Sequence, residues 1–133
     1  IIGRLVGSEM CIRDRCNSLE NDESWEVRRN AAIALEMHGD NSSSKSLSSA
    51  ISDLHWQVRK FSMRALTKVL SEEYLGEIVK LLCDDYSDVR KEAAIALGLL
   101  GSKKAIPSLK QSLDDADIEV RIQSQKALEK LNV

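Results

Sequence analysis

The residues best able to do chemistry in this sequence are aspartates and arginines that recur at a constant spacing. A Val-Arg dipeptide occurs four times, each 31 residues after the one before, and an aspartate stands five residues before each valine. Carboxylates and guanidinium groups form charge-assisted hydrogen bonds, often in parallel pairs. The pattern is the same in every repeat, which favours a structural role over a ligand site. We interpret it as a ladder of charged pairs that fastens one repeat to the next. The ladder residues are Asp22, Asp53, Asp84, Asp115, Arg28, Arg59, Arg90 and Arg121.

A second group of charged residues varies between repeats and is the better candidate for binding. Basic residues stand two or six positions after the repeated valine, and positions four residues apart share one face of a helix. With neighbouring aromatic residues they would suit an acidic protein segment or, less well, nucleic acid. The alternative is a solvated helix face with tryptophans that fill gaps between repeats. The candidate partner-binding residues are Trp25, Arg29, Trp56, Lys60, Phe61, Arg64 and Lys91.

Catalytic and metal-binding patterns are lacking in the sequence. The two histidines, His38 and His55, stand at non-equivalent positions of the repeat, and the three cysteines form no CxxC pair. There is no glycine-rich phosphate loop and no nucleophile elbow. Cys83 follows an amphipathic stretch, and we expect it to be a small core residue. We predict no catalytic residue, no metal site and no cofactor, which favours a non-enzymatic protein.

The elements that must position these residues are paired helices. In "KEAAIALGLLG" the apolar residues recur at helical spacing, and a second amphipathic stretch precedes it, separated by the acidic turn "CDDYSD". We call the first helix of each pair helix A and the second helix B. Gly39 and Gly101 are placed to close the B helices of the first and third pairs. A two-helix unit cannot bury its apolar face alone, so neighbouring units must stack. The sequence predicts an all-α fold, a right-handed α-solenoid of four helix pairs with a 31-residue repeat.

The repeat domain is expected over residues 16–133, with units at about 16–40, 41–71, 72–102 and 103–133. The first helix of the second unit lies in "NSSSKSLSSAISDLHW", where only Leu47, Ala50, Ile51 and Leu54 supply an apolar stripe. We expect this helix to be the least stable of the stack, with its serines serving as caps.

The overall composition is that of an ordinary soluble chain. Of 133 residues, 43% are hydrophobic and 30% charged, with a formal net charge of −2. This charge gives no general reason to expect nucleic acid or an anionic membrane as a partner. No apolar run approaches the roughly 20 residues that span a bilayer. The odd number of cysteines gives no disulfide framework, so we expect a protein of the reducing cytoplasm. We also expect the protein to be a monomer.

The motifs "IVKLLCDDYSDVRKEAAIALGLLG" and "LKQSLDDADIEVRIQSQKALEKL", the latter preceded by "KKAIP", resemble HEAT-like repeats of the short phycobilisome-lyase type. The resemblance runs from about Cys16 to Val133 and implies the fold more specifically than the function. The class includes adaptors, chromophore-lyase subunits, DNA glycosylases and an iron-dependent hydroxylase whose His-Glu ligand pairs do not occur here. We favour a non-enzymatic scaffold that binds another protein through its B helices. The alternatives are a phycobilin lyase or its accessory subunit, and a nucleic-acid-binding protein.

The first fifteen residues, "IIGRLVGSEMCIRDR", do not follow the repeat. Arg4, Gly7 and Glu9 interrupt any signal-peptide core. The portion "LVGSEMCIRDR" resembles translated sequencing-adaptor read-through in genes called from environmental DNA, and a divergent native segment is the alternative. Ile12, Cys16 and Leu19 nevertheless have helical spacing, which predicts a helix from about Arg13.

Overall fold

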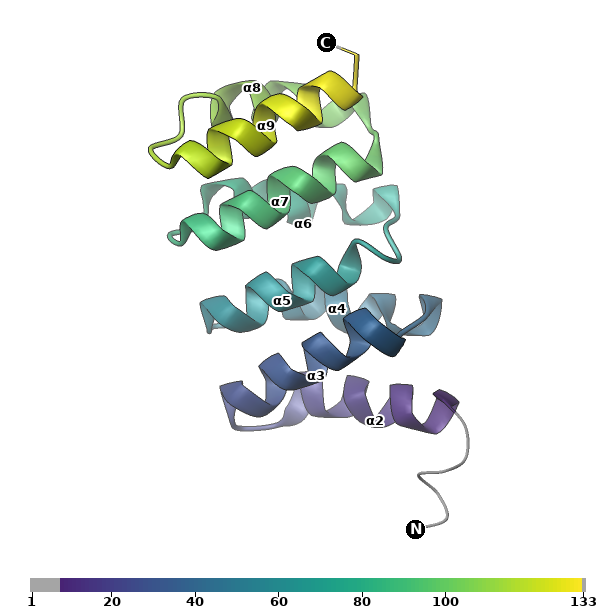
Figure 1. Cartoon of the computed structure of the whole chain (residues 1–133). Helices are drawn as coiled ribbons and strands as arrows, with labels where there is room; N and C mark the ends of the chain where they lie inside the picture. The colour runs from purple at the N-terminus through teal and green to yellow at the C-terminus, as the bar shows by residue number, and fades with distance from the viewer. Residues whose placement is uncertain (1–7, 133) are drawn as a thin grey trace. The chain divides into compact units, whose positions relative to one another are not determined.

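The protein is built from helix pairs. The computed structural model describes residues 8–132, with side chains from residue 12 onward, and the regular elements in that range are all helical. The first helix of each pair, helix A, is α2 (Ser8–Asn21), α4 (Ser44–Ala50), α6 (Leu75–Lys80) or α8 (Ile106–Ser112). The second, helix B, is α3 (Trp25–His38), α5 (Trp56–Leu66), α7 (Ser87–Leu100) or α9 (Ile118–Lys130) (Figure 1). Short 3-10 helices flank the A helices at Asn41–Ser43 (η1), Glu72–Tyr74 (η2), Leu81–Cys83 (η3) and Lys103–Ala105 (η4).

The B helices begin at Trp25, Trp56, Ser87 and Ile118, a constant 31 residues apart. The predicted all-α class and the helix-pair repeat are therefore confirmed. The chain divides into two compact units between Val69 and Leu70. In the first unit α2 packs on α3 and α4, and α3 packs on α5; in the second α6 packs on α7, α8 on α9, and α7 on α9 (Figure 1).

The buried residues are apolar residues that stand at equivalent positions in the four repeats. Leu35, Leu66, Leu97 and Leu128, eight residues after the valine, are at most 4% exposed. Val58, Val89 and Val120 are fully buried, whereas Val27 on α3 is 40% exposed. Because aliphatic side chains at helical spacing face one side of each helix, their burial accounts for the packing of A on B.

The repeated aspartates close the turns between helix A and helix B. A carboxylate oxygen of each accepts a hydrogen bond from the backbone N–H two residues later, at 2.8–3.0 Å: Asp22 from Ser24, Asp53 from His55, Asp84 from Tyr86 and Asp115 from Asp117. Such Asx turns satisfy backbone groups that would otherwise lack a partner beside the start of a helix. The turn aspartates thus stabilise the entry into all four B helices.

The two glycines that follow B helices act in different ways. Gly101 has φ of 78°, the left-handed conformation that favours glycine at a helix end. Gly39 is extended, with φ of −77° and ψ of 167°, so the predicted glycine cap is of another kind there. A Cβ at Gly39 would lie 2.5 Å from the backbone oxygen of Leu35, which is why this position requires glycine.

Two predictions about local structure need correction. Helix α2 begins at Ser8 rather than near Arg13. Ile12 and Leu19 are both buried, so the buried side of this helix already includes a residue before the predicted start. Residues 1–7 of the predicted non-repeat segment 1–15 lie outside the described range. In the second pair, Leu47 and Ile51 are fully buried as expected, but Leu54 is 97% exposed because the chain has already turned toward α5.

Candidate protein-binding surface

Two of the ladder arginines, Arg28 and Arg90, each join one helix pair to the next within a unit. In the first unit, Nε and Nη2 of Arg28 donate to the two carboxylate oxygens of Asp53 at 2.8 and 3.0 Å, and Nη1 donates to the backbone oxygen of Asp22 at 2.9 Å. The two side chains are only 17% and 12% exposed. These hydrogen bonds to Asp53 raise the pKa of the Arg28 guanidinium above its ordinary value.

The second unit repeats this geometry. Nε and Nη2 of Arg90 donate to Asp115 at 2.9 and 3.1 Å, and Nη1 donates to the backbone oxygen of Asp84 at 2.7 Å. Arg59 and Arg121 likewise donate to the backbone oxygens of Asp53 and Asp115, at 2.8 and 2.6 Å. In both bidentate pairs, the carboxylate comes from the repeat after that of the arginine. The carboxylates and guanidinium groups are thus engaged within the fold.

The basic and aromatic residues of α3 and α5 gather at the junction of these two helices. The ring of Trp25 stacks on that of His55, with centroids 3.6 Å apart and an angle of 5° between the planes. The guanidinium carbon of Arg29 lies 5.1 Å from the centroid of Trp25, and its Nη1 donates to Oε1 of Gln57 at 2.9 Å. Arg29 is therefore held by an aromatic ring on its own helix and an amide on the next.

Phe61 of α5 organises the other two cations. Nζ of Lys60 lies 5.3 Å from the centroid of its ring, and Cζ of Arg64 lies 5.7 Å from it. Cation–π contacts of this kind hold a cation in place without neutralising its charge. Arg64 also pairs with Glu36 of α3, with Nη2 and Oε2 3.6 Å apart, and its side chain remains 43% exposed. The ring centroid of Trp56 lies 6.4 Å from that of His55. We call the group of Trp25, Arg29, Trp56, Lys60, Phe61 and Arg64 the basic–aromatic surface.

The structure thus unites six of the seven predicted binding residues within the first unit. Lys91, the seventh, lies on α7 and is half-buried in the second unit. Sequence reasoning missed His55, Gln57 and Glu36, which complete the surface. Their helical positions were readable, but the contact of Trp25 with His55 depends on how α3 packs against the turn before α5.

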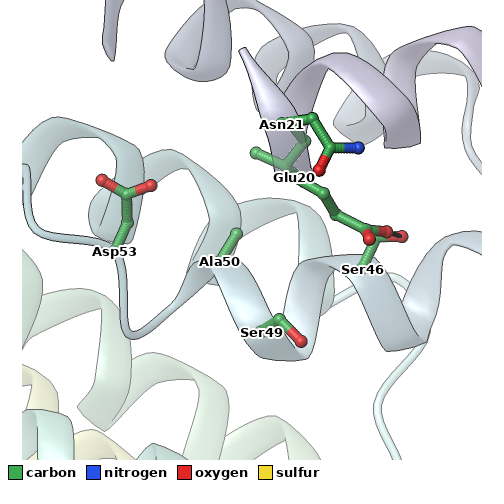
Figure 2. A pocket seen from close by; sticks show the side chains of 7 residues that line it. Glu20, Asn21, Ser46, Ser49, Ala50 and Asp53 are labelled. Carbon is green, nitrogen blue, oxygen red and sulfur yellow. Dashed lines mark hydrogen bonds between the residues drawn. The ribbon is translucent and has the colours of Figure 1, made fainter. Parts of the chain in front are cut away.

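The A-helix side of the first unit carries a polar depression of about 260 Å³ between α2 and α4 (Figure 2). The Ser46 hydroxyl donates to the Glu20 carboxylate there. Burial raises the pKa of the neighbouring Cys16 thiol. A thiol with a raised pKa is a poorer nucleophile at neutral pH. Within residues 8–132, no cluster of three or more His, Cys, Asp and Glu side chains is suited to a metal ion.

Cys83 is exposed at the end of η3, so its prediction as a core residue is wrong. It lines a groove of about 420 Å³ with residues of α6 and α8. The chain leaves helix A at this position, so the side chain of Cys83 points away from the core that contains Leu81 and Leu82. Among the described helices, none is long and apolar enough to cross a membrane.

Comparison with known proteins identifies the class. Residues 44–129 match the family model for HEAT repeats, and the chain therefore belongs to the HEAT-repeat family. The complex of CpcE and CpcF of phycocyanin lyase from Nostoc sp. PCC7120 contains a chain of similar fold. Its TM-score is 0.82 at 20% sequence identity, over 98% of this chain and 55% of that one.

A crystal structure of an engineered protein is also similar, with a TM-score of 0.68 and 25% identity over 94% of this chain and 62% of that one. The chain thus spans less than two thirds of either of these proteins. No curated protein matches the sequence. These likenesses agree with the family match in showing a HEAT-repeat fold.

Proposed function

We propose that this chain is a non-enzymatic HEAT-repeat scaffold that binds an acidic segment of another protein through the basic–aromatic surface. The observation that supports the proposal most is the way in which its cations are held. Arg29 is fixed by Trp25 and Gln57, and Arg64 by Phe61 and Glu36. A cation that is already ordered loses less side-chain entropy when it meets a carboxylate.

The electrostatics of the surface suit carboxylates better than a flat aromatic ligand. The Trp25 ring is already stacked on His55, and the Phe61 ring is in contact with two cations. The aromatic groups therefore serve to position charge. A protein segment rich in aspartate and glutamate would meet the guanidinium and ammonium groups directly.

Intrinsic fluorescence offers a direct test, because the only two tryptophans of the chain, Trp25 and Trp56, belong to this surface. Titration with a synthetic oligoglutamate peptide is expected to change the tryptophan emission, with an affinity that falls as salt rises. The double variant Lys60→Glu/Arg64→Glu is expected to weaken binding at least tenfold. A second double variant, Lys103→Glu/Lys104→Glu, makes the same charge change at exposed lysines of η4 and serves as the control.

Equal binding by the two double variants would reject the assignment of this surface. Circular dichroism must show native helix content in both, so that lost binding cannot be attributed to unfolding. An oligolysine peptide that binds as well as oligoglutamate would reject the acidic character of the partner.

A role as an accessory subunit of a phycobilin lyase is the second candidate function. It is supported by the fold likeness to a chain in the CpcE–CpcF complex of phycocyanin lyase. This role predicts that adding the chain to a bilin, an apo-phycobiliprotein and a companion lyase subunit increases covalently attached chromophore, read by absorbance after denaturation. Chromophore attachment that does not depend on the chain would remove this candidate.

A further inference from the structure

The exposed stripe of the B helices contains no acidic residue. It consists of the positions two before and two, six and ten after the repeated valine, each four residues from the next. In the second unit these are Ser87, Lys91, Ile95 and Leu99 on α7 and Ile118, Ile122, Lys126 and Lys130 on α9. The whole chain has more acidic than basic residues, so an acid-free stripe stands out against the average composition.

Four members of this stripe are aliphatic, and three of them are exposed to water. Ile118 is 59% exposed, Leu99 52% and Ile122 39%, and Ile95 is half-buried beside them on α7. We call Ile95, Leu99, Ile118 and Ile122 the aliphatic stripe. Three exposed large aliphatic side chains on two packed helices are more than the scattered single residues of an ordinary surface.

The backbones of α7 and α9 approach closely at Gly98, which lies between Ile95 and Leu99 in the sequence. A Cβ at Gly98 would lie 3.0 Å from Cα of Ala127, so the two helix backbones pack with no intervening side chain. A shallow groove of about 60 Å³ remains along the junction, lined by Ile95, Gly98, Gln123, Lys126, Ala127 and Lys130. Its floor is largely small or aliphatic, and its rim is basic.

The lysines beside the aliphatic stripe set the charge of what can bind. Lys126 and Lys130 are exposed, and the structure of residues 8–132 shows neither in an ion pair. In the first unit, by contrast, Arg64 at the position equivalent to Lys126 pairs with Glu36. Gly98 stands at the position of Glu36, so the second unit lacks that acid. An incoming carboxylate would supply the missing partner.

We propose that the aliphatic stripe binds an amphipathic helical segment of a partner protein, with the apolar side of that helix on Leu99, Ile118 and Ile122 and its acidic residues against the flanking lysines. An amphipathic helix that lays its apolar side on a hydrophobic surface is a common mode of peptide recognition. This inference rests on the proposed scaffold function and names the class of segment that the second unit takes.

The test uses the whole chain to select from a random library of peptides displayed on phage. Enriched peptides are expected to share apolar residues three or four positions apart with intervening Asp or Glu. Binding of a synthesised consensus peptide is expected to fall at least tenfold in Ile118→Asp/Ile122→Asp. The control is Leu54→Asp, which makes the same change at an exposed aliphatic residue of the first unit.

Several results would overturn the inference. These are selection of basic peptides, selection of nothing, or equal loss of binding in Leu54→Asp and in the stripe variant. Binding of vesicles with one third phosphatidylserine, lost in the stripe variant while the consensus peptide binds both proteins equally, would assign the stripe to a membrane instead. The proposed function is separable: Lys60→Glu/Arg64→Glu tests oligoglutamate binding to the first unit, whatever the stripe variant does to the selected peptide.

Discussion

The two units solve the same packing problem with different chemistry at their B-helix junctions. Between α3 and α5, Glu36 pairs with Arg64, and Trp25 stacks on His55. Between α7 and α9, Gly98 occupies the repeat position equivalent to that of Glu36. The two helices pack closely there, with Gly98 against Ala127. The first junction is polar and aromatic, and the second is small and aliphatic.

What the two units share is the bidentate pair that joins one turn to the next. Arg28 meets Asp53, and Arg90 meets Asp115, with nearly identical distances. Residues that fasten the repeat are therefore the same in both units, whereas residues on the exposed B-helix face differ. The comparison separates the maintenance of the fold from the surface that distinguishes one unit from the other.

The largest effect is expected from removal of the shared aspartates. Asp53→Ala or Asp115→Ala deletes a turn cap and leaves a largely buried guanidinium without its carboxylate, so each should lower the free energy of unfolding by about 3 kcal/mol. Urea unfolding followed by circular dichroism measures this loss, and tryptophan fluorescence reports the first unit alone. If one variant costs less than about 1 kcal/mol and the other costs the full amount, the two units are not fastened alike.

A smaller effect should be confined to the second unit. Gly98→Val places a branched side chain against Ala127 and should destabilise the α7–α9 junction by about 2 kcal/mol. Gly76→Val is the matched control, because a Cβ at Gly76 meets nothing within 4 Å. Urea midpoints that fall equally in both variants would show that helix propensity, and not the close approach, determines the cost.

A gain in stability is expected in both units from substitutions at one repeated position of the B helices, four residues after the valine. Among the described residues, Ser62 and Ser124 have fully buried hydroxyls without a hydrogen-bond partner, and the same column carries Ala31 and Ala93 in the other repeats. Ser62→Ala and Ser124→Ala should each raise the free energy of unfolding by about 1 kcal/mol. A decrease in the urea midpoint of either variant would indicate that its hydroxyl has a partner, such as a buried water.

The smallest effect concerns pH and only the first unit. Hydrogen bonds from the Ser42 hydroxyl and N–H lower the pKa of Asp40, whereas Ser71 and Ser102 cap the equivalent 3-10 helices. A carboxyl with a lowered pKa in the folded state stabilises the fold above its ordinary value of about 4, and this contribution is lost as the pH falls through the lowered value. Asp40→Ser should reduce the acid dependence of urea unfolding. An unchanged dependence would show that Asp40 does not contribute.

The sequence alone was sufficient to predict the helix pairs and most of their buried side. The 31-residue register places Leu35, Leu66, Leu97 and Leu128 in the core, because the period of an α-helix fixes which side chains share a face. It also grouped basic and aromatic residues of α3 and α5 as a candidate binding surface, and that role stays a prediction. Leu54 and Cys83 were predicted incorrectly because each lies where a helix ends, and there the period no longer decides which way a side chain points.

Only the tertiary structure decided which residues meet across repeats. The spacing predicted that aspartate and arginine columns pair, but packing showed that Arg28 reaches the carboxylate of Asp53 and only the backbone of Asp22. The sequence likewise did not predict the stacking of Trp25 on His55 or the contact of Gly98 with Ala127. A helical period specifies the faces of one helix, whereas the partner of each face depends on the offset and distance between helices, which their side chains set together.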